Sequence, residues 1–208
     1  LEQLIPIRGE IKDSIMQHNI DYRILSSIKM GVRSSKIEKL LFSSENSITR
    51  SILNLARSYR SLLDGNMNDM ELSLSVIESD LLPLQYGNLF NGLNRFIGAE
   101  NNIHSVVAVI LPLSGKDKLK GQTFLRGLSA MAVDYQYDLS THFKIYDNNS
   151  NDITTIKILK SINLDRSIIS ILGYLSEVSN IAATSYLSSI PVLLSKSNYS
   201  ELPTISEN

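Results

Sequence analysis

Cysteine and tryptophan are both missing from the 208 residues of this chain. Without cysteine there can be no disulfide, no thiolate metal site and no cysteine nucleophile. Long hydrophobic runs are missing too: no stretch approaches about 18 consecutive apolar residues, so the sequence predicts no ordinary membrane-spanning helix. Neither sign of charge is in excess, because 20 Lys and Arg residues face 21 Asp and Glu residues. The formal net charge of -1 argues against nucleic acid as a partner.

The first residues lack the features of a targeting signal. The chain begins at Leu1, without a methionine and without a charged start followed by an apolar core. We therefore expect that any signal peptide has been removed or was never present. Apolar residues are plentiful, at 43% of the chain, which is enough to bury a core. The length allows one domain or two, and a change of pattern near residue 100 favours two.

The first half of the chain, residues 1–100, shows helical spacing of its apolar side chains and little alternation. Between residues 22 and 42, apolar groups on both sides of Gly31 predict two short helices with a break. Before them, a short helix with one apolar face is predicted by four side chains spaced three or four residues apart: Leu4, Ile7, Ile11 and Ile15.

Two longer helices are predicted next. A strong apolar stripe begins at Ser47 and ends at the turn-forming residues 64–66, and a second helix runs from about residue 68 to residue 82, just before Pro83. With Ala56 and Tyr59 at the places of small and aromatic packing residues, this helical pair resembles a degenerate tetratricopeptide repeat. The alternative is a plain helical hairpin, because at least three stacked repeats are normally needed for stability.

From residue 101 the chain alternates between strand and helix patterns. The run Ser105–Leu111 is β-branched and apolar, as expected of a strand buried on both faces. Such alternation predicts right-handed crossovers and a parallel sheet whose ligand sites lie at the carboxyl ends of its strands. The predicted strands are 105–111, 142–146, 167–172 and 192–194, and the predicted helices are 119–135, 153–162 and 176–187.

Four segments of this second half carry a family resemblance: 109–115 followed by 121–128, then 144–149, 171–176, and 190–195 followed by 197–202. Their order and spacing resemble the first lobe of type I periplasmic binding proteins, such as the Leu/Ile/Val-binding proteins. Physical reasons support three of the glycines. We expect Gly115 to turn the backbone off the sheet, Gly121 to free the helix start, and Gly127 to let the helix pack closely on the strands.

The resemblance implies an α/β fold with two parts. Residues 1–100 would form an all-α, tetratricopeptide-like region, and residues 101–208 the first part of lobe 1 of a binding-protein-like domain. We expect the chain to stop before the second lobe that would close over a ligand.

Site residues are likewise implied by the resemblance: Ser114, Tyr174, Ser176 and Ser197 would contact a small ligand. In amino-acid-binding members, hydroxyl groups and the N–H groups of a helix start hold the ligand carboxylate. Here Glu177 stands beside Ser176 and would repel such a carboxylate, while Lys196 lies beside Ser197. The alternative role for Ser176 and Ser197 is helix capping and turn bonding.

Other motifs fail on their own chemistry. Ser114-Gly115-Lys116 lacks the earlier glycine and the following Ser or Thr of a phosphate-binding loop. The oxygen-bearing residues from Asp147 to Asn151 lack the glycine and the closing glutamate of a calcium loop. His18, His104 and His142 are far apart and lack ligand spacing, so no metal or other cofactor is predicted.

A helical region placed before a binding-protein fold resembles the lipoproteins that activate penicillin-binding proteins. This resemblance implies a non-enzymatic scaffold or regulator in the periplasm or cell envelope, with a lipid anchor at a removed N-terminus and an envelope protein as its partner. The alternative is a receptor for an amino acid or another small polar ligand. No residue constellation predicts an enzyme.

Overall fold

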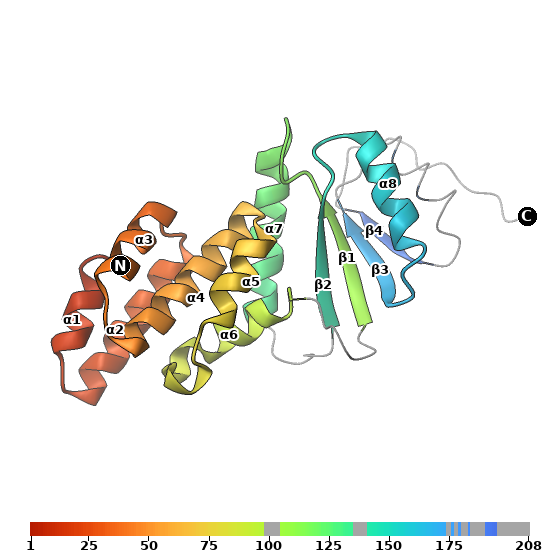
Figure 1. The fold of residues 1–208 in the computed structure, drawn as a ribbon. Helices are drawn as coiled ribbons and strands as arrows, with labels where there is room; N and C mark the ends of the chain where they lie inside the picture. Colours follow the sequence, from red (N-terminus) through yellow and green to blue (C-terminus); the bar gives the residue numbers. More distant parts are fainter. Residues whose placement is uncertain are drawn as a thin grey trace, which may run out of the picture.

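The structure is a computed structural model that describes residues 1–97, 105–134, 141–173 and 190–194, together with residues 176, 179 and 183. A helical region is followed by a parallel four-stranded β/α sheet, so the predicted α/β fold class is confirmed (Figure 1). The helical region consists of α1 (Leu4–Glu10), α2 (Ser14–Lys29), α3 (Ser34–Ser43), α4 (Ser47–Asp64), α5 (Met67–Ser75), the 3-10 helices η1 (Ser79–Leu81) and η2 (Leu84–Tyr86), and α6 (Gly87–Asn94). The rest consists of β1 (Ser105–Leu111), α7 (Lys118–Asp134), β2 (Thr141–Asp147), α8 (Asp152–Ile162), β3 (Ile168–Gly173) and β4 (Val192–Leu194).

Side-chain caps begin three helices of the helical region. Asp13, Asn46 and Asn66 precede α2, α4 and α5, and each side chain accepts a hydrogen bond from the backbone N–H three residues later. These bonds satisfy amide groups that have no partner inside a helix. Gly65 ends α4 in the left-handed conformation at φ 78°, so the predicted turn at 64–66 is confirmed.

The predicted apolar face of the first helix is wrong. The first helix ends at Glu10, and Ile11 is extended at φ -83° and ψ 125°. Ile7 and Ile15 are 44% and 72% exposed, whereas Ile5 and Arg8 are the buried residues of α1. The cause is the Asp13 cap, which starts a new helix and changes the rotation of the residues after it.

The second long helix is shorter than predicted. It ends at Ser75 instead of continuing to residue 82, and Leu72 on its predicted apolar stripe is 67% exposed. The hydroxyls of Ser73 and Ser75 donate to the carbonyls of Asp69 and Leu72, and such local bonds compete with helix continuation. The short helix α6 was not predicted, because glycine and asparagine, both weak helix formers, make up five of its eight residues.

A buried charged group joins three elements of the helical region. The Arg8 guanidinium of α1 lies 2.5 Å and 3.2 Å from the two carboxylate oxygens of Asp21 in α2. The Tyr86 hydroxyl of η2 donates to the same carboxylate at 2.9 Å. Burial raises the pKa of the Tyr86 phenol, so it stays a hydrogen-bond donor at all ordinary pH values. Because all three residues are less than 9% exposed, this group holds α1, α2 and η2 together away from water.

The sheet is parallel throughout, in the order β2-β1-β3-β4. The predicted parallel β/α arrangement is confirmed, and the predicted bounds of β1 and β4 agree with the structure residue for residue. Side chains of β1 alternate between two cores. Val109 and Leu111 pack with α7 and the helical region, whereas Ala108 and Ile110 pack with Leu159 of α8 and its neighbours.

Helix α7 joins the two halves of the molecule. Figure 1 shows it lying between the helical region and the sheet, and its buried side chains belong to the same apolar cluster as those of α4 and β1. Gly92 allows α6 to approach α7 closely, because a Cβ added at Gly92 would lie 2.8 Å from Val133. Arg95, just after α6, donates to the Thr141 carbonyl at 3.2 Å, and its own carbonyl accepts from Phe143 at 2.8 Å. The helical region and the sheet therefore share one continuous core.

The three predicted glycine roles have different outcomes. Gly115 has φ 76° and turns the chain off β1, as predicted. Gly121 lies in the first turn of α7, where it lets the helix approach the loop after β1. A Cβ there would meet the backbone of Pro112, 2.7 Å from its carbonyl carbon. The prediction for Gly127 is wrong, since a Cβ there would find no atom within 4 Å. Leu125 and Leu128 make the close packing of α7 instead. Among the described residues, no helix combines the length and apolar character needed to cross a membrane.

Candidate functional site

A recess lies at the carboxyl ends of the strands, where ligands bind to open parallel sheets. It is formed by the loop after β1, the loop after β2 and the first turn of α8. Its volume is about 120 Å³. The residues that line it are Pro112, Lys116, Asp117, Asn148, Ser150, Asn151, Asp152 and Ser176.

The carboxylate of Asp147 ties the loops after β1 and β2 together. One of its oxygens accepts from the backbone N–H groups of Leu113, Ser114 and Asn149 at 2.9, 3.1 and 2.8 Å. The other accepts from the Ser114 hydroxyl at 2.5 Å. Ser114 was predicted to contact a ligand, and in the structure its hydroxyl bonds to side chains of the chain itself, the Asp147 carboxylate and, at 2.9 Å, the Asn149 amide oxygen. A hydrogen bond to a charged acceptor is stronger than one to a neutral group.

The same two loops interlock at a second point. The Ser150 hydroxyl donates to the Ser114 carbonyl at 2.9 Å and accepts from the Asp117 N–H at 3.0 Å. Asn149 and Ser150 both have φ 51°, a backbone conformation that non-glycine residues adopt only where their surroundings hold them there. A Cβ at Gly115 would lie 2.7 Å from the Asn149 carbonyl oxygen. The recess is therefore bounded by a rigid pair of loops.

The carboxylate of Asp152, the first residue of α8, is the hydrogen-bond partner of Ser176, a second residue predicted to contact a ligand. The Ser176 hydroxyl donates to this carboxylate, and the Ser179 hydroxyl donates to the same oxygen at 2.9 Å. Ser176 Oγ also accepts from the Ser179 N–H at 3.1 Å, a capping bond of the kind given above as the alternative role. Tyr174 and Ser197 lie outside the described residues, so the structure brings only Ser114 and Ser176 to this edge. A ligand role for the four residues stays a prediction.

Sequence reasoning did not find the role of Asp152. The signal was present, because Asn151 is a good capping residue and an acidic residue directly after it suits the first turn of a helix. Asn151 does cap α8, accepting from Ile153 and Thr154 N–H groups at 2.9 and 3.1 Å. The partnership with Ser176 could not be read from the sequence, because it joins residues 24 positions apart that follow β2 and β3, two strands on either side of β1.

Charge around the recess is balanced. Lys120 donates to the Asp117 carboxylate at 2.8 Å and holds the pKa of that carboxyl below its usual range. Among the residues that the structure describes, no three histidines or carboxylates are grouped so that they could hold a metal ion. His18 lies in α2 and His142 in β2, where its ring nitrogen is 3.2 Å from the Ile97 carbonyl, and His104 lies outside the described residues.

Removal of the Ser114 hydroxyl tests the hydrogen bond to Asp147 that joins the loops after β1 and β2. We expect Ser114→Ala to lower the free energy of unfolding by about 1 to 2 kcal/mol, because the Asp147 carboxylate loses a charge-assisted hydrogen bond. Urea denaturation followed by circular dichroism measures the change. Ser161→Ala is the matched control, since its exposed hydroxyl bonds to the Ile158 carbonyl of its own helix. Equal stabilities of the two variants would mean that the bond from Ser114 to Asp147 does not stabilise the fold.

Comparison with known proteins identifies no family, because no protein-family model and no curated protein matches the sequence. Two solved structures of LpoA from Haemophilus influenzae are similar to the chain. One is a monoclinic form, with 15% identity and a TM-score of 0.36, and the other is the full-length protein, with 17% identity and a TM-score of 0.37. Each alignment covers 94% of this chain and 35% of the LpoA chain. At these TM-scores the likeness has no bearing on function.

Proposed function

We propose that this chain acts through protein contacts, as a non-enzymatic scaffold or regulator in the periplasm or cell envelope. The observation that carries the proposal is the use of both described site hydroxyls within the protein. Ser114 donates to Asp147, and Ser176 donates to Asp152. A hydroxyl has one proton, so a hydroxyl that donates to a protein carboxylate cannot also donate to the carboxylate of a ligand.

Charge favours the same proposal. A ligand carboxylate placed at Ser176 would lie against Asp152, and like charges at such a distance repel each other. A second candidate is a receptor for a small polar ligand that carries its own cation, because Asp152 would attract such a group.

Among the described residues, large exposed apolar side chains occur in the helical region and in the β/α part alike. Large exposed apolar residues beyond scattered single ones mark interaction surfaces. We take residues 1–100 and 101–208 as the two parts of the proposed scaffold. The exposed residues of the helical region are Ile7, Ile15, Met16, Tyr22, Met30, Phe42, Leu72, Val76 and Leu84.

Thermal denaturation separates the two candidates. A ligand present at about 100 times its Kd stabilises a protein by about 2.7 kcal/mol, which raises Tm by about 5 to 10 °C at this size. We expect no amino acid and no soluble cell-wall fragment to raise Tm by more than about 1 °C. A rise of several degrees that Asp152→Ala changes would instead establish the solute receptor.

A second experiment tests for the partner directly. A photo-cross-linking residue replaces Phe42, which is 95% exposed, or Leu164, which is 83% exposed in the β/α part. Irradiated cells that make the full-length protein are expected to yield a cross-link to one defined envelope protein. If neither position cross-links to any protein, the scaffold proposal is wrong.

A further inference from the structure

The outer face of α5 carries exposed apolar side chains. Leu72 and Val76 are 67% and 60% exposed and lie one helical turn apart, on the side opposite the buried Met70 and Leu74. Two aliphatic side chains on one exposed face contribute little to the core of the chain. Adjacent apolar side chains rimmed by polar ones mark a contact with another molecule.

The chain around this face contains acidic residues and no basic ones. Residues 61–94 include five carboxylates and not one Lys, Arg or His. Two of the five, Asp64 and Asp69, are paired with arginines of α4 at 2.6 and 2.7 Å. The outer face of α5 is therefore an apolar surface with an uncompensated negative charge. The other three carboxylates are exposed and make no ion pair in the described part of the chain: Glu71, Glu78 and Asp80.

These three carboxylates select a class of partner. They do not form a metal site, because no three histidines or carboxylates of the described residues are grouped closely enough to hold one ion. Anionic lipid headgroups and nucleic acid would be repelled by the same charges. Carboxylates spread along a surface suit cations that are spaced along a chain in the same way. A protein segment with Lys or Arg side chains is the complementary partner.

Helix α5 is held firmly in place, so its outer face is formed before a partner arrives. Asp69 of α5 accepts from Arg57 at 2.7 Å and from the Ser61 hydroxyl at 2.6 Å, and both donors belong to α4. On the inner face, Met70 and Leu74 are 1% and 3% exposed and belong to the core that α4 shares. A preformed surface loses little conformational entropy on binding.

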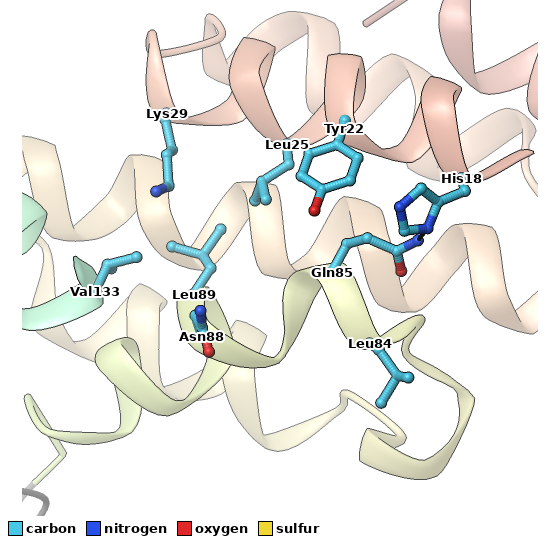
Figure 2. A pocket seen from close by; sticks show the side chains of 9 residues that line it. All are labelled: His18, Tyr22, Leu25, Lys29, Leu84, Gln85, Asn88, Leu89 and Val133. Carbon is cyan, nitrogen blue, oxygen red and sulfur yellow. Dashed lines mark hydrogen bonds between the residues drawn. The ribbon is translucent and has the colours of Figure 1, made fainter. Parts of the chain in front are cut away.

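A groove beside α2, between that helix and η2 with α6, is a second hollow of the helical region. Its volume is about 500 Å³, and Figure 2 shows the side chains of α2 facing Gln85 and Leu89 across it. Its polar groups are already used, because the Gln85 amide nitrogen contacts His18 Nδ1 and Lys29 has a partner as well. The lining residues of this groove therefore offer no unpaired charge that would select a partner, in contrast to the outer face of α5.

We infer that the outer face of α5 binds a basic segment of a partner protein that also carries an apolar side chain. The apolar side chain packs on Leu72 and Val76. Lysine or arginine side chains of the segment pair with the three exposed carboxylates. This inference rests on the proposed function and names the surface that would perform it. The α5 face so defined consists of Glu71, Leu72, Val76, Glu78 and Asp80.

Selection from a displayed library of random octapeptides tests the inference on the intact chain. Selected peptides are expected to combine Lys or Arg with at least one large apolar residue. Leu72→Ala with Val76→Ala should weaken their binding about tenfold, and Glu71→Gln with Glu78→Gln about fivefold. The second loss should shrink at high salt. Fluorescence anisotropy of labelled selected peptides measures both losses.

Matched variants elsewhere in the helical region serve as controls. Glu10→Gln with Glu45→Gln removes the same charge from two exposed residues, and Phe42→Ala removes an apolar group that is 95% exposed. Both should leave peptide affinity unchanged. The inference is wrong if no peptide is enriched, if the selected peptides lack basic or large apolar residues, or if the variants of the α5 face bind as well as the controls.

Other outcomes are distinguishable. Concentration-dependent dimerisation that Leu72→Ala with Val76→Ala abolishes in sedimentation would identify a second copy of the chain and overturn the inference. The proposed function is tested separately. A partner cross-link at Phe42 or Leu164 that persists in the same double variant would keep the scaffold and reject the α5 face.

Discussion

Asp21→Ala is expected to lower the free energy of unfolding by about 3 to 5 kcal/mol, because it leaves a buried guanidinium without its counter-charge. Arg8 and Asp21 are 8% and 2% exposed, so water cannot replace the lost partner. The Tyr86 hydroxyl, bonded to the same carboxylate at 2.9 Å, loses its acceptor as well. Urea denaturation should show the midpoint moving to lower concentration with the slope nearly unchanged.

A double variant identifies the cause of that loss. Arg8→Met with Asp21→Leu removes both charges and fills the space with apolar atoms, so stability should recover most of the way. Glu2→Ala is the surface control: Glu2 pairs with Lys36 at 2.8 Å with both side chains about half exposed, and its loss should leave the denaturation midpoint in place. If the double variant is as unstable as Asp21→Ala alone, an uncompensated charge is not the cause.

The elements that could be predicted from the sequence are those whose pattern is local. The β-branched run of β1 and the αL glycine that ends α4 are determined by residues next to each other, and the structure agrees with both predictions. The first helix could not be placed correctly, because the Asp13 cap overrides an apolar spacing that continues through it. Helix α6 forms despite weak helix formers, since Leu89 and Leu93 are buried against the rest of the core.

The position of Ser114 and Ser176 in the fold could be predicted from the sequence, but the hydrogen bonds that they make could not. The alternation of strands and helices put Ser114 and Ser176 at the carboxyl edge of a parallel sheet, where both lie. Their bonds to Asp147 and Asp152 span 33 and 24 residues and depend on which loops the sheet brings together. The groove beside α2 had no sequence signal, because its two walls come from helices far apart in the chain that only tertiary contacts, such as the bond from Tyr86 to Asp21, bring together.

Two glycines of α7 are expected to respond to alanine with opposite signs. Gly121→Ala should destabilise the protein by about 3 kcal/mol, because the new methyl group would overlap the Pro112 backbone, 2.7 Å from its carbonyl carbon. A backbone carbonyl next to a proline ring cannot move aside as a flexible side chain can. The loop that begins at Pro112 also contains Ser114, so a displacement of Pro112 would weaken the hydrogen bond from Ser114 to Asp147.

Gly127→Ala in the same helix is the matched control. A Cβ there would meet no atom within 4 Å, so only the helix preference of alanine remains, and stability should rise by about 0.5 to 1 kcal/mol. Thermal and urea denaturation of the two variants measure both signs in one experiment. Destabilisation by Gly127→Ala would mean that α7 packs on the strands at that glycine after all. A neutral Gly121→Ala would mean that α7 can move away from the β1 loop, and the loops at the strand ends would then be less rigid than their hydrogen bonds indicate.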